Sequence, residues 1–257
     1  MAGARRHERR DGDGGAFSLG AALMPGLFRP ILAGATFRDR LVACLGAGVG
    51  IALVALACLG RLKLPPGTPE VVAPIGASAV LVFAVPASPL AQPWPVLGGN
   101  TVGALVGVAF AQSLGATPLA AGLAVGAAIL AMSLLRCLHP PGGAAALVAV
   151  IGGPAVAGAG WLFPFVPVAV NSALLVAVAW SFHRLTGHGY PHRAAPPRSQ
   201  PVFLPQDLDR ALEAEHETFD IAREDLERLL ARVEAEAAAR VQTASRTAPP
   251  RRVTKAT

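Results

Sequence analysis

The chain has 257 residues, of which 53% are hydrophobic and 15% charged, and its formal net charge is +6. With a mean hydropathy of +0.50, this composition excludes an ordinary soluble domain and an intrinsically disordered chain. Aromatic residues make up only 5% of the chain, so we expect no nucleic-acid partner, because base stacking needs aromatic side chains. The positive charge indicates lipid headgroups instead.

The charged residues are concentrated at the two ends of the chain. Between Leu41 and Phe182 the charged residues are Arg61, Lys63, Glu70 and Arg136. A neutral middle with basic flanks is typical of a multi-pass membrane protein whose partner is the lipid bilayer and whose N- and C-termini are cytoplasmic. Composition divides the chain into a basic N-terminal tail with an interfacial segment (1–40), a transmembrane domain (41–183), a basic Pro-rich linker (184–205), amphipathic cytoplasmic helices (206–241) and a disordered basic tail (242–257).

Six apolar segments are expected within the transmembrane domain. The segments 41–60, 96–115, 118–136 and 162–182 are long enough to cross roughly 30 Å of hydrocarbon. The segments that begin at Pro74 and Pro140 are shorter, and the first has only about 17 Å of helix before Pro86. The sequence therefore predicts an all-α polytopic helix bundle with four full spans and two short interrupted helices. Both short segments could instead be re-entrant, which leaves four crossings.

The order of long and short segments occurs twice along the chain. An offset of 66 residues carries Pro74 onto Pro140 and the segment 96–115 onto 162–181. A unit of three crossings places the second unit upside down relative to the first, which predicts a 3+3 inverted repeat. Transporters with such repeats bind substrate near the midplane, where the broken helices meet.

The two breaks have residue types that suit an anion site. Proline begins a helix without an unpaired amide, glycine permits close approach, and a helix start attracts anions. We expect a small anion to contact residues in and near the two breaks: Pro74, Gly76, Ala77, Ser78, Asn100, Arg136, His139, Pro140, Pro141, Gly142 and Gly143.

Four of the polar residues have alternative interpretations. Arg136 either extends to the headgroups or reaches the permeating anion. His139 is either a proton-linked gate or a structural residue that caps the helix or bonds a neighbouring carbonyl. Asn100 and Asn171 either contact substrate or join helices by hydrogen bonds.

Small residues recur every four positions on two of the long segments. This spacing predicts close helix packing, either within one subunit or between subunits of a homo-oligomer, through Gly99, Gly103, Gly107, Gly122 and Gly126.

The sequence offers little for an enzyme or a metal site. His183, His188 and His192 stand without a cysteine or carboxylate cluster, and we place them at the membrane interface. Three isolated cysteines predict no disulfide framework. Since phosphate-binding and catalytic motifs are also missing, we expect no enzyme activity, cofactor or metal.

Four motifs in order resemble the HPP family of integral membrane proteins. They are GASA (76–79), SPLAQP (88–93), the glycine pair 98–99 and HPPGGA (139–144), and the resemblance covers roughly residues 30–190. It implies a protein of the bacterial inner (plasma) membrane and, from plastid and cyanobacterial relatives, nitrite transport. Many members have histidine where this chain has Asn100, which implies a different specificity if that position contacts substrate.

The C-terminal segment resembles the linker that joins some members of the family to a pair of CBS domains, which this chain lacks. Residues 206–241 carry leucines at helical spacing and are expected to form a hairpin, a dimer contact or a solvated relic. The preferred hypothesis is a transporter or channel for a small monovalent anion such as nitrite. The alternative is a non-transporting scaffold or sensor whose cytoplasmic helices recruit a partner.

Overall fold

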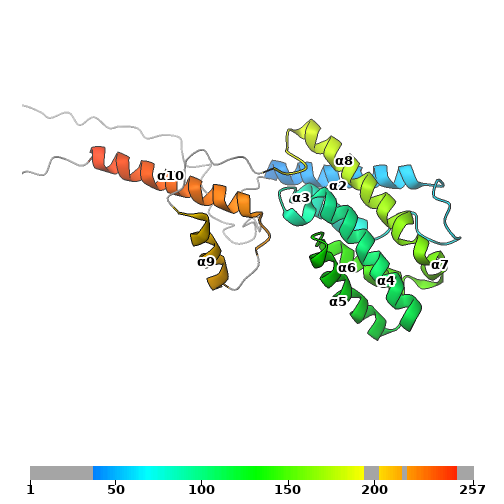
Figure 1. Cartoon of the computed structure of the whole chain (residues 1–257). Helices are drawn as coiled ribbons and strands as arrows, with labels where there is room; N and C mark the ends of the chain where they lie inside the picture. Colours follow the sequence, from blue (N-terminus) through cyan, green and yellow to red (C-terminus); the bar gives the residue numbers. More distant parts are fainter. Residues whose placement is uncertain (1–36, 194–202, 216–218, 248–257) are drawn as a thin grey trace, which may run out of the picture. The chain divides into compact units, whose positions relative to one another are not determined.

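The computed structural model describes residues 37–193, 203–215 and 219–247 (Figure 1). The interfacial segment expected before residue 37, the middle of the linker and the tail beyond residue 247 lie outside the described residues. The chain divides into two compact units, Met1–Arg40 and Leu41–Thr257, and helices α3 to α10 belong to the second. The described residues form helices and no strand, as the all-α expectation requires.

Three helical segments are long and apolar enough to cross a membrane. They are α2 (Phe37–Cys58), η2 with α4 (Pro95–Leu114), and η4 with α8 (Pro164–Thr186). A fourth crossing exists if α6 (Pro140–Ile151) forms one span with α7 (Gly153–Ala159) and η3 (Gly160–Leu162), which continue at a bend of 100°. The helix α5 (Pro118–Leu134) has 17 residues. The chain is thus a multi-pass protein, and the division into four full and two short crossings stays a prediction.

Proline and glycine set the lengths of the two short helices. Helix α3 (Pro74–Ala84) has Pro74 in its first turn and ends two residues before Pro86. Helix α6 begins with two prolines and ends at Ile151. Gly152 caps it, and Gly153 follows at φ +82°. Proline presets the first helical turn, and glycine adopts the left-handed backbone without a steric penalty. Both helices are short, as expected, with 11 and 12 residues.

Each of the two longest later spans begins with a π-helical segment. The segment η2 (Pro95–Gly99) leads into α4 (Asn100–Leu114), and η4 (Pro164–Ala169) leads into α8 (Val170–Thr186). The first turn of each α-helix contains an asparagine followed by a hydroxyl residue, which are Asn100-Thr101 in α4 and Asn171-Ser172 in α8. The order of a short proline-initiated helix and a long π-initiated helix therefore occurs twice. The inverted orientation of the second set stays a prediction.

Glycine brings α4 into close contact with α6. A Cβ atom on Gly103 would lie 2.0 Å from the Gly142 carbonyl oxygen, and one on Gly107 would lie 2.3 Å from the Ala146 carbonyl oxygen. Similarly, a Cβ atom on Gly99 would lie 2.5 Å from the Cβ of His139. The three glycines of this ridge thus pack within one chain.

The glycines of α5 make no close packing contact within the chain. Gly122 and Gly126 are exposed, and a Cβ on either would meet nothing within 4 Å. Helix α5 packs with its opposite face, where Ala120, Ala124 and Ala128 are fully buried. The same four-residue spacing exists on both faces of α5, and within the chain the alanine face makes the contact.

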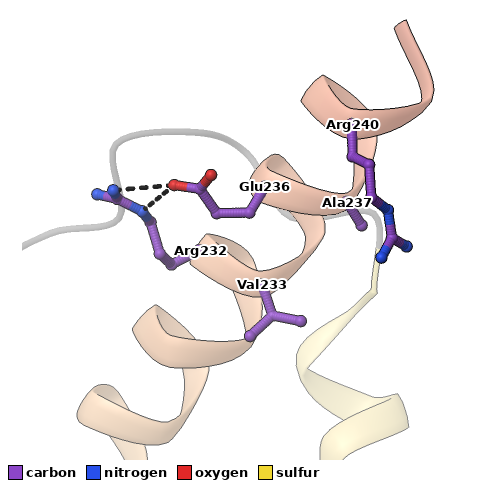
Figure 2. Close-up of a pocket in the computed structure, with 5 residues that line it drawn as sticks. All are labelled: Arg232, Val233, Glu236, Ala237 and Arg240. Carbon is purple, nitrogen blue, oxygen red and sulfur yellow. Dashed lines mark hydrogen bonds and ion pairs between the residues drawn. The ribbon is translucent and has the colours of Figure 1, made fainter. Parts of the chain in front are cut away.

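The C-terminal segment forms two helices, α9 (Pro205–Glu215) and α10 (Arg223–Thr247). Arg223 joins them: its guanidinium donates to Asp209 and, at 3.1 Å, to the Pro205 carbonyl oxygen. The hydrogen bond from Arg223 lowers the pKa of Asp209 below its ordinary value. Farther along α10, Arg232 pairs with Glu236 at 2.9 Å beside Val233 and Ala237 (Figure 2). Helix α10 continues to Thr247, beyond the expected end at residue 241.

Candidate functional site

A polar cluster lies buried where α3, α4, α6 and α8 meet. Ser78, Asn100, His139 and Ser172 each have a relative exposure of 0%. The Asn100 Nδ2 atom lies 3.0 Å from Ser78 Oγ and 3.1 Å from Ser172 Oγ, and Ser78 Oγ lies 2.8 Å from His139 Nε2. Polar groups are costly in a membrane interior and are concentrated at functional sites there. We take this cluster as the candidate site.

The hydrogen-bond partners determine the tautomer of His139. Its Nδ1 atom lies 2.8 Å from the Leu90 carbonyl oxygen, which only accepts. Nδ1 therefore carries the proton, and in the neutral ring Nε2 is the acceptor. Ser78 then donates to Nε2 and accepts from Asn100. The result is a directional chain of donors from Asn100 through Ser78 and His139 to Leu90.

The partners also determine the orientation of the Asn100 amide. Ser172 donates to the Val168 carbonyl oxygen at 2.9 Å, so its oxygen is an acceptor for Asn100. Both amide hydrogens of Asn100 are thereby used. Its Oδ1 atom is buried and has no hydrogen-bond partner among the described residues. A buried unpaired acceptor costs free energy, about 1–3 kcal/mol.

A second asparagine fixes the chain just before α3. Asn171 Oδ1 accepts from the Val72 amide at 3.0 Å, and its Nδ2 donates to the Glu70 carbonyl oxygen at 2.9 Å and contacts Cys58 Sγ at 3.3 Å. Irregular backbone inside a membrane protein needs such partners, since no water satisfies it. Of the two alternatives left open for Asn171, these contacts show it joining helices.

The Ile75, Gly76 and Gly142 amides at the two helix starts already have acceptors in this conformation. In the first break, the Ile75 and Gly76 amides donate to the Val72 and Ala73 carbonyl oxygens, both at 3.0 Å. In the second, Pro140 and Pro141 have no N–H and the Gly142 amide donates to the His139 carbonyl oxygen at 2.8 Å. The four side chains of the cluster are also fully buried in this conformation.

Comparison with known proteins now identifies the family. The family model described as HPP, transmembrane region, matches residues 33–191. The chain belongs to the HPP family. Two transmembrane proteins of Dictyostelium discoideum are similar to it, at 37% identity over 139 residues and 39% identity over 107 residues. These matches cover 52% and 40% of this chain, and 44% and 37% of the relatives. The chain thus spans less than half the length of the curated relatives it matches. No solved structure matches.

The HPP motifs meet at the polar cluster. The GASA motif provides Ser78, the HPP motif provides His139, and the SPLAQP motif provides the Leu90 carbonyl that accepts from His139. Motifs that are far apart in the sequence thus share one chain of hydrogen bonds.

The remaining predicted site residues divide between the surroundings of the cluster and the surface. Pro74 provides a carbonyl oxygen 3.2 Å from Ser78 Oγ, and Pro141 and Gly142 are buried against α4. Gly143 is half-buried. The exposed members of the predicted set are Gly76, Ala77, Arg136 and Pro140.

Arg136 in particular is not brought into the cluster. It is exposed at the end of α5 with φ +54°, and the helix ends there because the backbone turns left-handed. Ser172, by contrast, was missed by the sequence reasoning. The signal that could have found it was a hydroxyl next to Asn171 near the start of an apolar span.

His183, in the last turn of α8, and the two histidines that follow the helix have separate partners. His183 Nε2 donates to the Val82 carbonyl oxygen at 2.9 Å, His188 contacts Thr186, and His192 pairs with Asp225 at 2.8 Å. Among the described residues, no three potential metal ligands come together.

Proposed function

We propose that this HPP protein transports a small monovalent anion together with a proton through the cluster of Ser78, Asn100, His139 and Ser172. The observation that carries the proposal is the directional hydrogen-bond chain that ends on His139. Nitrite is the first candidate substrate, because the family resemblance implies it. The protein would act in the bacterial inner membrane with both termini in the cytoplasm, without enzyme chemistry or a cofactor.

Anion binding at this cluster requires a proton. An anion needs hydrogen-bond donors, yet the donors of the neutral cluster are all engaged with Ser78, Ser172, Val168, His139 and Leu90. Protonation of His139 at Nε2 supplies one new donor and one positive charge. The anion and the proton therefore bind as a neutral pair.

Ser78 allows this change because its hydroxyl hydrogen has a second acceptor. Its hydroxyl lies between His139 Nε2 at 2.8 Å and the Pro74 carbonyl oxygen at 3.2 Å. When Nε2 is unprotonated, the hydroxyl donates to it. When Nε2 is protonated, the hydroxyl donates to Pro74 instead, and the Nε2 hydrogen is left for the anion.

Substrate access requires helix movement, because the cluster is closed in this conformation. The π-helical segment η2 lies directly before Asn100, and η4 ends at Ala169, close before Ser172 on the other span. Single π turns are often found at functional sites and at bends of helices. We place the hinges of the opening movement in these two segments.

The test is nitrite uptake by proteoliposomes that contain the full chain, with and without an inward proton gradient. We expect uptake above empty vesicles, stimulated by the gradient and abolished in His139→Ala. Arg136→Gln is the matched control, since Arg136 lies outside the cluster, and it should retain wild-type flux. Equal uptake by protein-free vesicles and wild-type vesicles, across several anions and both gradient directions, would refute transport.

One observation favours the second candidate function, a membrane scaffold or sensor. The cytoplasmic hairpin exposes apolar side chains, with Phe219 at 51%, Leu229 at 53% and Val233 at 56% of their surface. Exposed apolar side chains on a helix suit a protein partner. Retention of one specific partner by the wild-type chain but not by Leu229→Glu, in a chain without flux, would support this alternative.

A further inference from the structure

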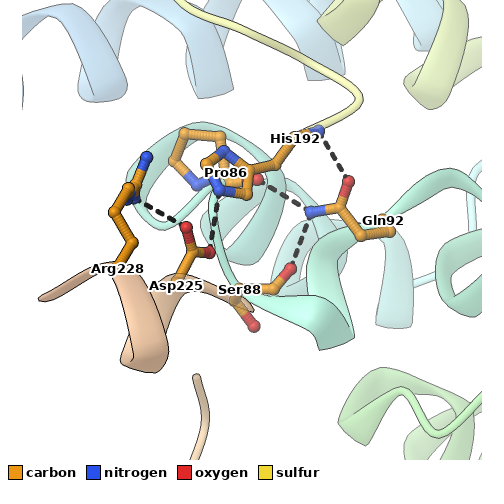
Figure 3. A network of polar contacts seen from close by, with 6 residues as sticks. All are labelled: Pro86, Ser88, Gln92, His192, Asp225 and Arg228. Carbon is orange, nitrogen blue, oxygen red and sulfur yellow. Dashed lines mark hydrogen bonds and ion pairs between the residues drawn. The ribbon is translucent and has the colours of Figure 1, made fainter. Parts of the chain in front are cut away.

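The loop between α3 and η2 links the polar cluster to the cytoplasmic segments. Within this loop, Gln92 Nε2 donates to the Pro86 carbonyl oxygen at 2.9 Å and to the Ser88 carbonyl oxygen at 2.8 Å (Figure 3). Ser88 Oγ accepts from the Leu90 amide at 3.1 Å. The loop is therefore held in one shape, and that shape directs the Leu90 carbonyl at His139.

The chain that follows α8 holds the same loop from its other side. The Tyr190 hydroxyl donates to the Ala91 carbonyl oxygen at 3.0 Å, and the His192 amide donates to Gln92 Oε1 at 2.8 Å. Burial raises the pKa of Tyr190 well above its ordinary value, so its hydroxyl remains a donor at physiological pH. These two bonds are made to the residues that lie one and two positions after Leu90.

Helix α10 completes the connection. Asp225 accepts from His192 Nε2 at 2.8 Å and from Arg228 at 2.6 Å, and only 9% of its side chain is exposed (Figure 3). Just before the helix, Asp220 accepts from Ser88 Oγ at 2.8 Å. Two carboxylates at the start of α10 thus hold the loop, one directly and one through His192.

We infer that the start of α10, through Asp225, His192 and the loop Pro86–Gln92, positions His139 and thereby sets the rate of transport. This inference rests on the proposed function. The Leu90 carbonyl keeps the proton of neutral His139 on Nδ1, which leaves Nε2 ready to take the transported proton. When α10 leaves the loop, Leu90 is held less firmly and the other tautomer, with its proton on Nε2, becomes populated. That tautomer has no free acceptor toward the cluster.

The geometry favours a positioning role over simple attachment of the tail. Asp220, Tyr190 and the His192 amide bond the loop Pro86–Gln92 directly, and Asp225 bonds it through His192. The hairpin has its own closing ion pair at Arg223, which does not involve the loop. The contact with the loop is thus separate from the folding of the hairpin, and loss of Asp225 can be tested with the hairpin intact.

The test combines two measurements on the full chain in lipid nanodiscs and proteoliposomes. Histidine labelled with ¹⁵N reports the tautomer of His139, whose signal is assigned by its loss in His139→Ala. In Asp225→Asn, and independently in Tyr190→Phe, we expect the His139 shifts to move from the Nδ1–H form toward a mixture. Nitrite flux should fall by about fivefold, as a coupling of ordinary size between two sites implies.

The matched control is Glu224→Gln. Glu224 lies in the same first turn of α10 and is exposed, so its substitution removes an equal charge near the same helix start. Its His139 shifts and flux should equal those of the wild type. Unchanged His139 shifts in both Asp225→Asn and Tyr190→Phe would overturn the inference, whatever the flux does. A wild-type chain with no flux would refute the proposed function, while the ¹⁵N shifts would still decide whether α10 positions His139.

Discussion

Each hydrogen bond of the central cluster requires a particular donor and a particular acceptor. Ser172 illustrates this, because its hydroxyl donates to Val168 and its oxygen accepts from Asn100. Removing it leaves one buried amide hydrogen without a partner. Such a loss has the full cost of desolvating that group, because no water replaces the missing oxygen.

We therefore predict that Ser172→Ala lowers the free energy of unfolding by about 1–3 kcal/mol. Unfolding by denaturant in detergent micelles measures it. Ser133→Ala is the control, because Ser133 is exposed and donates only to Ile129 of its own helix, and its change should stay within about 0.5 kcal/mol. Equal effects of the two substitutions would show that Asn100 does not depend on Ser172.

At the scale of elements, the approach of α4 to α6 decides where the cluster forms. Gly103 contacts backbone atoms of Gly142, only three residues beyond His139. The glycine ridge therefore determines how close the histidine comes to Asn100. Any side chain on this face of α4 would separate the two helices.

Gly103→Ala should destabilise the protein by about 1–3 kcal/mol or more, as overpacking does. The added Cβ would lie 2.0 Å from a backbone oxygen that cannot move by itself. Gly126→Ala makes the same chemical change where nothing lies within 4 Å, and it should be neutral or stabilising by up to about 1 kcal/mol. Thermal unfolding of both variants in nanodiscs checks this, and a stabilised Gly103→Ala protein would contradict the packing.

The hairpin of α9 and α10 should open at acidic pH. Its Asp209 has a pKa below the ordinary value because Arg223 donates to it, so its stabilising effect is complete above the unfolded pKa of about 3.9 and disappears as pH falls through the lower folded value. Hydrogen exchange in α9, corrected for intrinsic rates, should rise only in that range. In Asp209→Asn it should already be raised at neutral pH. Indistinguishable exchange in the two proteins at neutral pH would exclude a role for the pair.

At the scale of the whole molecule, the proposed mechanism has an electrical consequence. A lone anion that crosses the membrane experiences about 2.3 kcal/mol per 100 mV, whereas an anion that crosses with a proton carries no net charge. In the proposed mechanism both bind at one cluster of four buried side chains, so neither is expected to cross alone.

We predict electroneutral uptake, with one proton entering per anion. A potassium diffusion potential of about 100 mV imposed with valinomycin should leave the initial nitrite flux unchanged, whereas a tenfold proton gradient should change it. External pH recorded during uptake should rise in step with the nitrite that enters. A flux that follows the voltage would mean that the anion moves without the proton.

The amino-acid sequence by itself determined the membrane location, the all-helical class, the short helices at Pro74 and Pro140, and the HPP family. These properties depend on local chemistry, since apolar length, proline and glycine act within a few residues of their own position. Ser78, Asn100 and His139 could also be selected, because polar residues are conspicuous in apolar segments.

Only the tertiary structure decided which of these residues meet. It brought Ser172 into the cluster, left Arg136 exposed, turned the alanine face of α5 inward in place of Gly122 and Gly126, and used up the amides at both helix starts. Which face of a helix is buried, and which carbonyl accepts from which donor, depend on partners 22 to 132 residues away in the sequence. Local pattern contains no record of those distances, because they arise only when the helices pack.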